Sequence, residues 1–269
     1  MSTNVMTQGG SRIGVETRMY FRAPDTLFFT FLFPFVMLAI FSAAFSASGE
    51  VGPPGSEITV AALYLPAMLA SGIFLSGVQN LAIDIALEKS NGTLKRLGGT
   101  PLSPVAYFLG KIGQVFVTGT LQAALLILAG WLVLGIALPT EPEKWLTFAW
   151  VFVLGLTTCA LIGIALSALP RSGKSAAAVV IPIGLILQFI SGVYLQWNML
   201  PDWLQNIASI FPLKWIAQGM RSVFLPDGWE ALEQNESWNL PGVAIALVVW
   251  LVISLVLSRL TFRWIRRDA

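Results

Sequence analysis

The sequence predicts an all-α polytopic membrane protein with six transmembrane helices. First, 56% of its 269 residues are hydrophobic and only 11% are charged, whereas an average soluble domain carries about 25% charged residues. Second, six apolar segments reach the roughly 20 residues that a membrane span needs. Third, the basic residues gather on one side of these segments. A soluble enzyme and a disordered scaffold are therefore excluded, and the net charge of +2 is too small for a nucleic-acid-binding protein.

The six expected spans form one transmembrane domain over residues 1–269. They cover about 27–47, 59–83, 112–136, 146–169, 176–197 and 242–262. None of them carries a charged residue except near its ends. A charged side chain at the bilayer centre costs about 2.5–3.5 kcal/mol on insertion scales, so this pattern is typical of membrane helices. Pro34, Pro66 and Pro182 are expected to kink the first, second and fifth spans.

The distribution of Lys and Arg predicts the orientation. With a cytoplasmic N-terminus, 13 of the 16 basic residues lie in segments on the inner side. Only Lys144, Lys214 and Arg221 fall outside. Because short cytoplasmic loops are enriched in basic residues, both termini are expected in the cytoplasm of a multi-pass cell-membrane protein, in a bacterial plasma membrane.

Residues 1–26 are expected to form a helix at the cytoplasmic surface of the membrane before the first span. Over residues 11–24, helical spacing separates an apolar arc from most of the basic residues. The arc consists of Ile13, Thr17, Tyr20 and Phe21, and the basic residues are Arg12, Arg18 and Arg22.

The link between the second and third spans, residues 84–111, is expected in the cytoplasm because Lys95 and Arg96 cannot span. A short helix should run from about Thr93 to Leu97 and stop at the following Gly-Gly pair. Ser103 and Pro104 are typical of an N-cap and a first helical residue. The expected structure is therefore a short charged helix held between two rigid spans.

The outer loop, residues 198–241, is expected to contain two short helices with apolar faces. The first starts at Pro201 and carries Trp203, and Pro212 separates it from the second, which carries Arg221. Each is too short to cross a bilayer, so the pair is interpreted as a re-entrant hairpin that dips in from outside.

The polar residues inside the expected spans are mostly amides. Gln79, Asn80, Gln122 and Gln188 could form hydrogen bonds between helices or line a substrate route, and the sequence leaves both interpretations open. No ionisable residue lies at mid-membrane, and the nearest, Asp84, falls at the cytoplasmic edge of the second span. This absence disfavours a proton-coupled carrier, which usually needs such relays.

No cofactor or metal site is expected in this chain. It has one cysteine, Cys159, and no histidine, so neither a disulfide nor a Cys/His metal site can form. Gly173-Lys174-Ser175 matches the end of a phosphate-binding loop, but the required earlier glycine is replaced by Ala168. Nucleotide binding by this chain is therefore not expected.

Two segments carry a resemblance to a known family. Residues 88–103 read EKSNGTLKRLGGTPLS and are followed by a Gly-Lys pair at 110 and 111. The outer segment contains Ser-Gly-Val at 191–193, Leu-Pro-Asp-Trp-Leu at 200–204, Pro212 and Arg221. With the order of six spans, this pattern resembles the permeases of type-2 ABC exporters over nearly the whole chain.

The resemblance implies one half of a dimeric pore, paired with an identical or a different permease chain and surrounded by membrane lipid. It also implies separate cytoplasmic ATPase subunits that hold ATP and Mg²⁺, so that this chain is not itself an enzyme. The residues implied to form the coupling helix and its flanks are Glu88, Gly92, Thr93, Leu94, Leu97, Thr100, Pro101 and Leu102. Those implied to form the outer hairpin are Pro201, Trp203, Pro212 and Arg221.

The expected function is ATP-driven export of an amphipathic drug, antibiotic or lipid-like compound, as in permeases that resemble daunorubicin exporters. The short outer loops favour this branch, because they leave no room for a separate extracytoplasmic domain. Export of a lipid-linked polysaccharide or cell-wall polymer is the main alternative. An ion-coupled carrier and a non-transport membrane scaffold are further alternatives.

Overall fold

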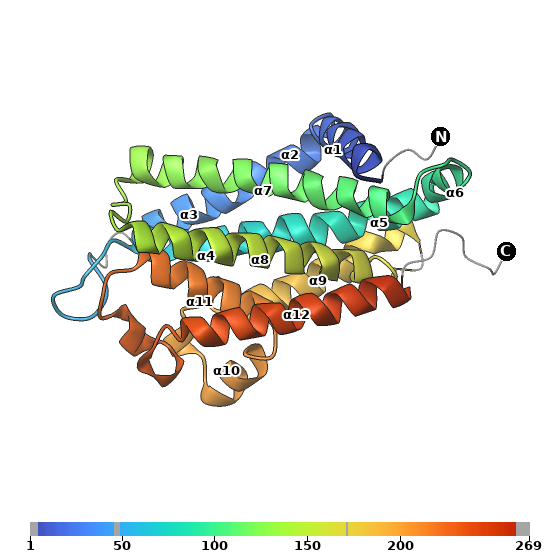
Figure 1. Ribbon diagram of the computed structural model, residues 1–269. Helices are drawn as coiled ribbons and strands as arrows, with labels where there is room; N and C mark the ends of the chain where they lie inside the picture. The colour runs from blue at the N-terminus through green and yellow to red at the C-terminus, as the bar shows by residue number, and fades with distance from the viewer. Residues whose placement is uncertain (1–4, 46–48, 171, 262–269) are drawn as a thin grey trace.

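The computed structural model describes residues 5–45, 49–170 and 172–261, and within them the chain is a bundle of long helices (Figure 1). Val51 and Ile58 form an isolated antiparallel β-bridge. Four basic residues on which the predicted orientation depends, Arg171, Arg263, Arg266 and Arg267, lie outside the described residues.

Five helices in the described part of the chain are long and apolar enough to cross a membrane. They are α4 continued into α5 (Val60–Ser90), α7 (Pro104–Leu134), α8 (Pro142–Leu166), α9 (Gly173–Ile190) and α12 (Leu240–Thr261). α4 (Val60–Phe74) and α5 (Leu81–Ser90) are joined by a π-helical turn, Leu75–Asn80. α4 is almost completely buried in the centre of the bundle, whereas most of α12 is exposed.

Most of the first expected span, residues 27–47, is helical, and its end falls partly in residues 46–48, which lie outside the described residues. After α2 (Pro24–Leu27), a π-helical turn, Phe28–Leu32, leads into α3 (Phe33–Ala44). Together they form a shorter apolar helix, Phe28–Ala44. Pro34 lies inside this continuous helix, two residues after the π-helical turn, and its kink stays a prediction. Pro66 and Pro182 also lie inside helices, α4 and α9.

The helix that contains the second expected span continues to Ser90, and α7 begins at Pro104, as the Ser103-Pro104 signal predicted. Lys111, which we expected to precede the third span, lies inside α7 and is fully buried. The helix continues through this charge because carboxylates surround it, as described below.

Two prolines start the helices of the outer loop. α10 (Asp202–Ala208) follows Pro201, and α11 (Pro212–Phe224) begins at Pro212. α11 lies against α4, α8 and α12, and 11 of its 13 residues are buried. Figure 1 shows α11 within the bundle and α10 at its side. The two predicted helices are therefore present, and their entry into a membrane stays a prediction.

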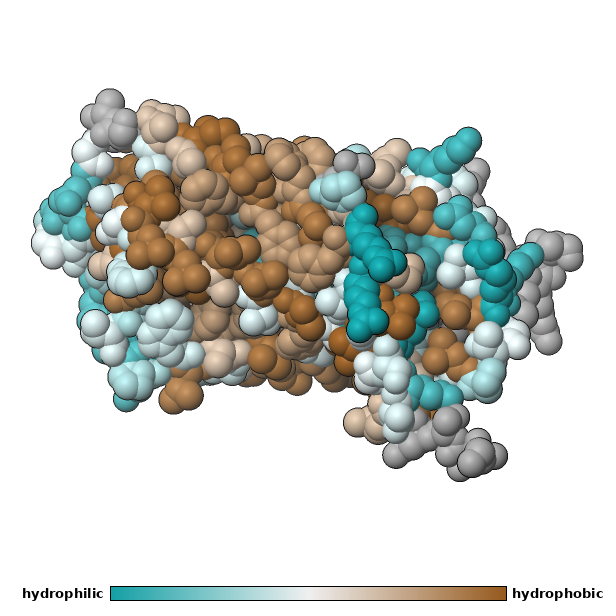
Figure 2. All heavy atoms as spheres, turned by 90° about the horizontal axis from the view of Figure 1, so that it is seen from above, coloured by the Kyte–Doolittle hydropathy of each residue, from teal (hydrophilic) through white to brown (hydrophobic). Residues whose placement is uncertain are grey.

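α1 (Val5–Tyr20) packs against α7, toward the end of the bundle that carries α6 (Thr93–Gly98) (Figure 1). Its predicted apolar arc faces protein: a Cβ on Gly113 of α7 would overlap Ile13, and the Tyr20 hydroxyl donates to Thr30 Oγ1 at 2.6 Å. Burial raises the pKa of Tyr20, which keeps this hydroxyl a donor. Figure 2 shows α1 where the hydrophobic middle of the surface gives way to a polar end.

Glycine allows the closest helix crossing in the bundle core. A Cβ on Gly163 of α8 would overlap the carbonyl oxygen of Gly77, which lies in the π-helical turn before α5. We expect Gly163→Ala to destabilise the fold by about 1–3 kcal/mol, because the two backbones must separate. Thermal unfolding of the purified protein measures this loss. Gly14→Ala is the matched control, since its Cβ meets open space, and an equal loss in both variants would contradict the prediction.

Candidate functional site

The coupling segment, defined here as residues 88–102, begins at the end of α5 and includes α6. Gly92 adopts a positive φ of 73° before α6, a conformation that side chains rarely tolerate. Leu94 is buried and fixes the helix to the bundle. Lys95, Arg96, Thr100 and Pro101 are exposed. α6 therefore presents a rigid basic surface at one end of the molecule.

The predicted helix signals around α6 are confirmed. α6 ends at Gly98, with Gly99 as its C-cap, and the Thr100 hydroxyl donates to the Leu97 carbonyl at 2.6 Å. Ser103 caps α7 by accepting the Ala106 N–H at 3.1 Å. These bonds hold the chain in a tight turn between the two long helices.

Glu88 lies inside the structure instead of on the surface of the coupling segment. Its side chain is 8% exposed, and it accepts a hydrogen bond from the Tyr107 hydroxyl at 2.6 Å. Its other oxygen pairs with Lys111 at 2.8 Å. Glu88 therefore joins α5 to α7 directly beneath the exposed helix.

Lys111 is the centre of an ion cluster, which we call the Lys111 cluster, in which Lys111, Glu16 and Glu88 are buried and Asp84 is half exposed. The Lys111 ammonium lies 2.8 Å from Glu16, 2.5 Å from Asp84 and 2.8 Å from Glu88. Arg12 pairs with Glu16 at 2.6 Å. Three carboxylates thus face two cations and join α1, α5 and α7. The three carboxylates lie within 4.8 Å of one another, close enough for a metal ion, but the ammonium that bonds to all three supplies the cation here.

The amides inside the spans lie between helices. Gln188 Oε1 accepts from Ser71 at 2.5 Å and from the Tyr194 hydroxyl at 2.9 Å. Asn80 Nδ2 donates to Thr30 at 2.8 Å. These bonds favour the helix-packing interpretation for both residues.

Gln79 and Gln122 are also buried, and each occupies the space left by a glycine. Gln79 lies against Gly184 of α9, and Gln122 lies against Gly72 of α4. Both side chains therefore fill contacts between helices in this conformation. A role for the four amides in lining a substrate route stays a prediction.

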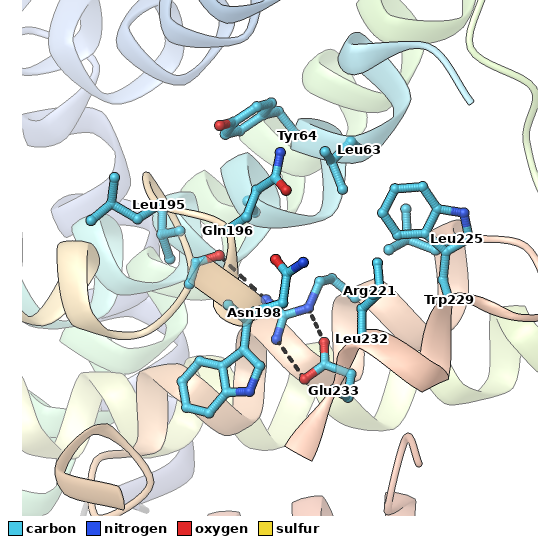
Figure 3. Close-up of a pocket in the computed structure, with 14 residues that line it drawn as sticks. Leu63, Tyr64, Leu195, Gln196, Asn198, Arg221, Leu225, Trp229, Leu232 and Glu233 are labelled. Carbon is cyan, nitrogen blue, oxygen red and sulfur yellow. Dashed lines mark hydrogen bonds and ion pairs between the residues drawn. The ribbon is translucent and has the colours of Figure 1, made fainter. Parts of the chain in front are cut away.

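A small cavity lies at the opposite end of the bundle from α6 (Figure 3). Its volume of about 40 Å³ has room for a few water molecules and is far below the roughly 300–1,000 Å³ of a drug-sized pocket. It is lined by the start of α4, the turn after α9, the end of α11 and the loop after α11, including Tyr64, Trp197, Arg221, Trp229 and Glu233.

Arg221 closes this cavity on the side of the outer loop. Figure 3 shows its guanidinium between Glu233 and the turn after α9. Nη2 donates to Glu233 Oε2 at 3.1 Å, Nε donates to the other carboxylate oxygen, and Nη1 donates to the Gly192 carbonyl at 3.3 Å. Both charged side chains are almost fully buried. This geometry is a bidentate clamp that joins three segments at the end of the bundle opposite α6.

The comparisons with known proteins decide the family. The family model described as ABC-2 family transporter protein matches residues 54–260, most of the chain. This chain belongs to the ABC-2 transporter family. Membership assigns it to the membrane transport permeases, as the resemblance of the sequence predicted.

Individual relatives of this ABC-2 protein are distant. The probable multidrug ABC transporter permease YbhR of Escherichia coli K12 is 23% identical over 202 residues, 71% of this chain and 54% of YbhR. The chain thus spans about half the length of that relative. The putative transport permease ycf38 is 23% identical in Porphyra purpurea, over 87% of this chain and 79% of the relative. In Cyanophora paradoxa it is 26% identical, over 77% and 71%.

The ABC-2 match begins after α1, so it includes Asp84, Glu88 and Lys111 but not Glu16. Sequence reasoning identified Glu88 and the Gly-Lys pair as motif residues without bringing them together. It missed Glu16 as a partner of Lys111, because the two residues are 95 positions apart in the chain. It missed Glu233 as the partner of Arg221, because Glu233 lies in an irregular loop. A charge inside a helical apolar run, as at Lys111, is the signal that could have revealed a buried counter-charge.

Proposed function

We propose that this chain is the membrane subunit of an ATP-driven exporter and that the coupling segment docks on a separate cytoplasmic ATPase. The observation that carries the proposal is the basic surface of α6, which is exposed at its tip and rigidly supported from beneath. ATP and Mg²⁺ would bind the ATPase, and a second permease chain, identical or different, would complete the pore.

The contacts suggest how force would pass from the ATPase into the bundle. Closure of the ATPase would press on α6, which short turns join to α5 on one side and to α7 on the other. Because the Lys111 cluster ties α5, α7 and α1 together, these helices would tilt as one unit.

An amphipathic drug, antibiotic or lipid-like compound is the substrate class we propose. The similarity to YbhR, a probable multidrug ABC transporter permease, supports this class. Transport assays with reconstituted protein and its ATPase test it. Uptake of fluorescent amphipathic dyes into inverted vesicles supports the class, whereas movement of a lipid-linked oligosaccharide alone would replace it with the polymer alternative.

Charge reversal on α6 tests the docking surface. We expect Lys95→Glu with Arg96→Glu to weaken ATPase binding by about tenfold or more, since repelling charges replace an exposed basic surface. Co-purification and stimulated ATP hydrolysis measure the effect. Lys144→Glu, at the far end of the bundle, is the control and should leave both readouts unchanged. Normal binding by the double variant would contradict the docking assignment.

The orientation is tested by cysteine labelling. The native Cys159 is completely buried, so a membrane-impermeant maleimide should report only introduced cysteines. We expect Ser237→Cys to react in intact cells and Lys95→Cys to react only after permeabilisation. The reverse pattern would overturn the proposed cytoplasmic position of the coupling segment.

A further inference from the structure

α1 has two chemically different faces. The inner face contains the buried residues Gly9 and Glu16, which lie against α7. A helix turns about 100° per residue, so Arg18 projects almost opposite to Glu16. Ser11 and Gly14 share this outer face and are exposed. Their small side chains leave the guanidinium of Arg18 accessible.

The exposed charge of α1 and its following turn is entirely positive. Arg18 and Arg22, one helical turn apart, are both exposed. Glu16 is the sole carboxylate of α1, and it is buried and already paired with Lys111 and Arg12. Among the described residues no carboxylate pairs with Arg18 or Arg22. Within the part of the chain that the structure describes, both guanidinium groups are thus free for an external anion.

Large apolar side chains accompany these arginines at the surface. Val15 and Met19 on the flank of α1 are 44% and 49% exposed, and the nearby Phe28 and Phe29 are 56% and 64% exposed. In Figure 2 a row of hydrophilic side chains crosses the molecule where α1 lies, directly beside the hydrophobic band. An amphipathic helix with this pattern suits the depth of lipid headgroups.

We propose that the outer face of α1, with Arg18 and Arg22, binds the headgroups of anionic phospholipids in the membrane leaflet at the α6 end of the bundle. The planar guanidinium of arginine can donate two parallel hydrogen bonds to the oxygens of a phosphate. The apolar flank of α1 would place both guanidinium groups at the level of a lipid phosphate. This inference rests on the position of α1 at the membrane surface, and it does not depend on the ATPase.

The inner face of α1 gives such binding a structural consequence. α1 is joined to the Lys111 cluster, and Gln8 Nε2 donates to the Pro101 carbonyl of the coupling segment at 3.3 Å. A lipid that fixes α1 therefore also restrains the coupling segment and the helices beside it. We expect anionic lipid to raise the thermal unfolding midpoint of the protein.

The test uses the full chain in nanodiscs of phosphatidylcholine, with and without phosphatidylglycerol. Each basic residue near an anionic surface contributes about 1 kcal/mol, which is about a fivefold change in affinity. Arg18→Gln with Arg22→Gln is therefore expected to lower the affinity for phosphatidylglycerol by about 30-fold, measured by native mass spectrometry of retained lipid. The rise in unfolding midpoint should disappear in the same variant, and Arg18→Lys with Arg22→Lys should keep most of both effects.

Lys95→Gln with Arg96→Gln is the matched control, because it removes two charges from the tip of α6 beyond the hydrophobic band. The proposal is overturned if this control loses as much lipid as the α1 variant, or if the α1 variant retains phosphatidylglycerol like the native chain. It is also overturned if inorganic phosphate in neutral nanodiscs raises the midpoint equally, which would indicate a free-anion site. Added salt should weaken the lipid effect, since exposed charges are screened.

Discussion

Lys111→Met is expected to destabilise the protein by about 3–5 kcal/mol, the usual cost of removing one partner from a buried ion pair. The substitution keeps the length of the side chain but leaves three carboxylates, from Glu16, Asp84 and Glu88, close together. Glu88 is almost fully buried, so water cannot replace the lost ammonium. Chemical denaturation of purified protein and the amount of folded protein in membranes measure the effect.

Two further variants separate charge from packing in the Lys111 cluster. Lys174→Met removes an exposed cation from the start of α9 and should have little effect. Adding Glu88→Gln to Lys111→Met removes one repelling carboxylate, whose cation partner is Lys111, and should restore part of the loss. If Lys111→Met is as stable as the native chain, or if Glu88→Gln worsens it, the ionic account of this cluster is wrong.

The local features of the coupling segment were predictable from the sequence because they depend on neighbouring residues. Ser103 and Pro104 start α7, and Gly98 and Gly99 end α6, through contacts that span three or four positions. Pro212 likewise separates α10 from α11. Such signals depend on backbone hydrogen bonds and dihedral preferences, which act in the same way in any fold.

The ion pairs were not predictable, because they depend on distant residues. Hydropathy ended the second span before Asp84 and began the third after Lys111, but it gave no sign that these two residues form an ion pair. Glu16 reaches Lys111 from 95 positions away. A single sequence contains no signal for such a pairing, since it arises only when α1 crosses α7.

The two charged clusters lie toward opposite ends of the bundle and differ in the kind of segment that they join. The Lys111 cluster joins regular helices, α1, α5 and α7. The Arg221 clamp joins one helix, α11, to an irregular turn at Gly192 and to the loop that contains Glu233. Loops open at a lower free-energy cost than packed helices. We therefore expect a small local change to open the bundle first at the end that contains Arg221.

Arg221→Met is the change that tests this difference. It should cost about 3–5 kcal/mol, because Glu233 stays buried without a cation and the Gly192 carbonyl loses its donor. The loss should concentrate in the outer loop, which Trp229 also ties to Ser56 through a 2.8 Å hydrogen bond. Hydrogen exchange of the purified protein should show faster exchange over the turn after α9 and residues 225–239, with α5 and α7 unchanged.

Lys144→Met serves as the control for that experiment, because Lys144 makes an exposed pair with Glu141 at 4.0 Å that contributes at most about 1 kcal/mol. The reversed pair, Arg221→Glu with Glu233→Arg, should recover part of the stability, since both charges are again compensated. Equal exchange at both ends of the bundle after Arg221→Met would show that the clamp supports the whole fold. Faster hydrogen exchange confined to the turn after α9 and residues 225–239 would instead show that this loop can open over the cavity while the Lys111 cluster stays intact.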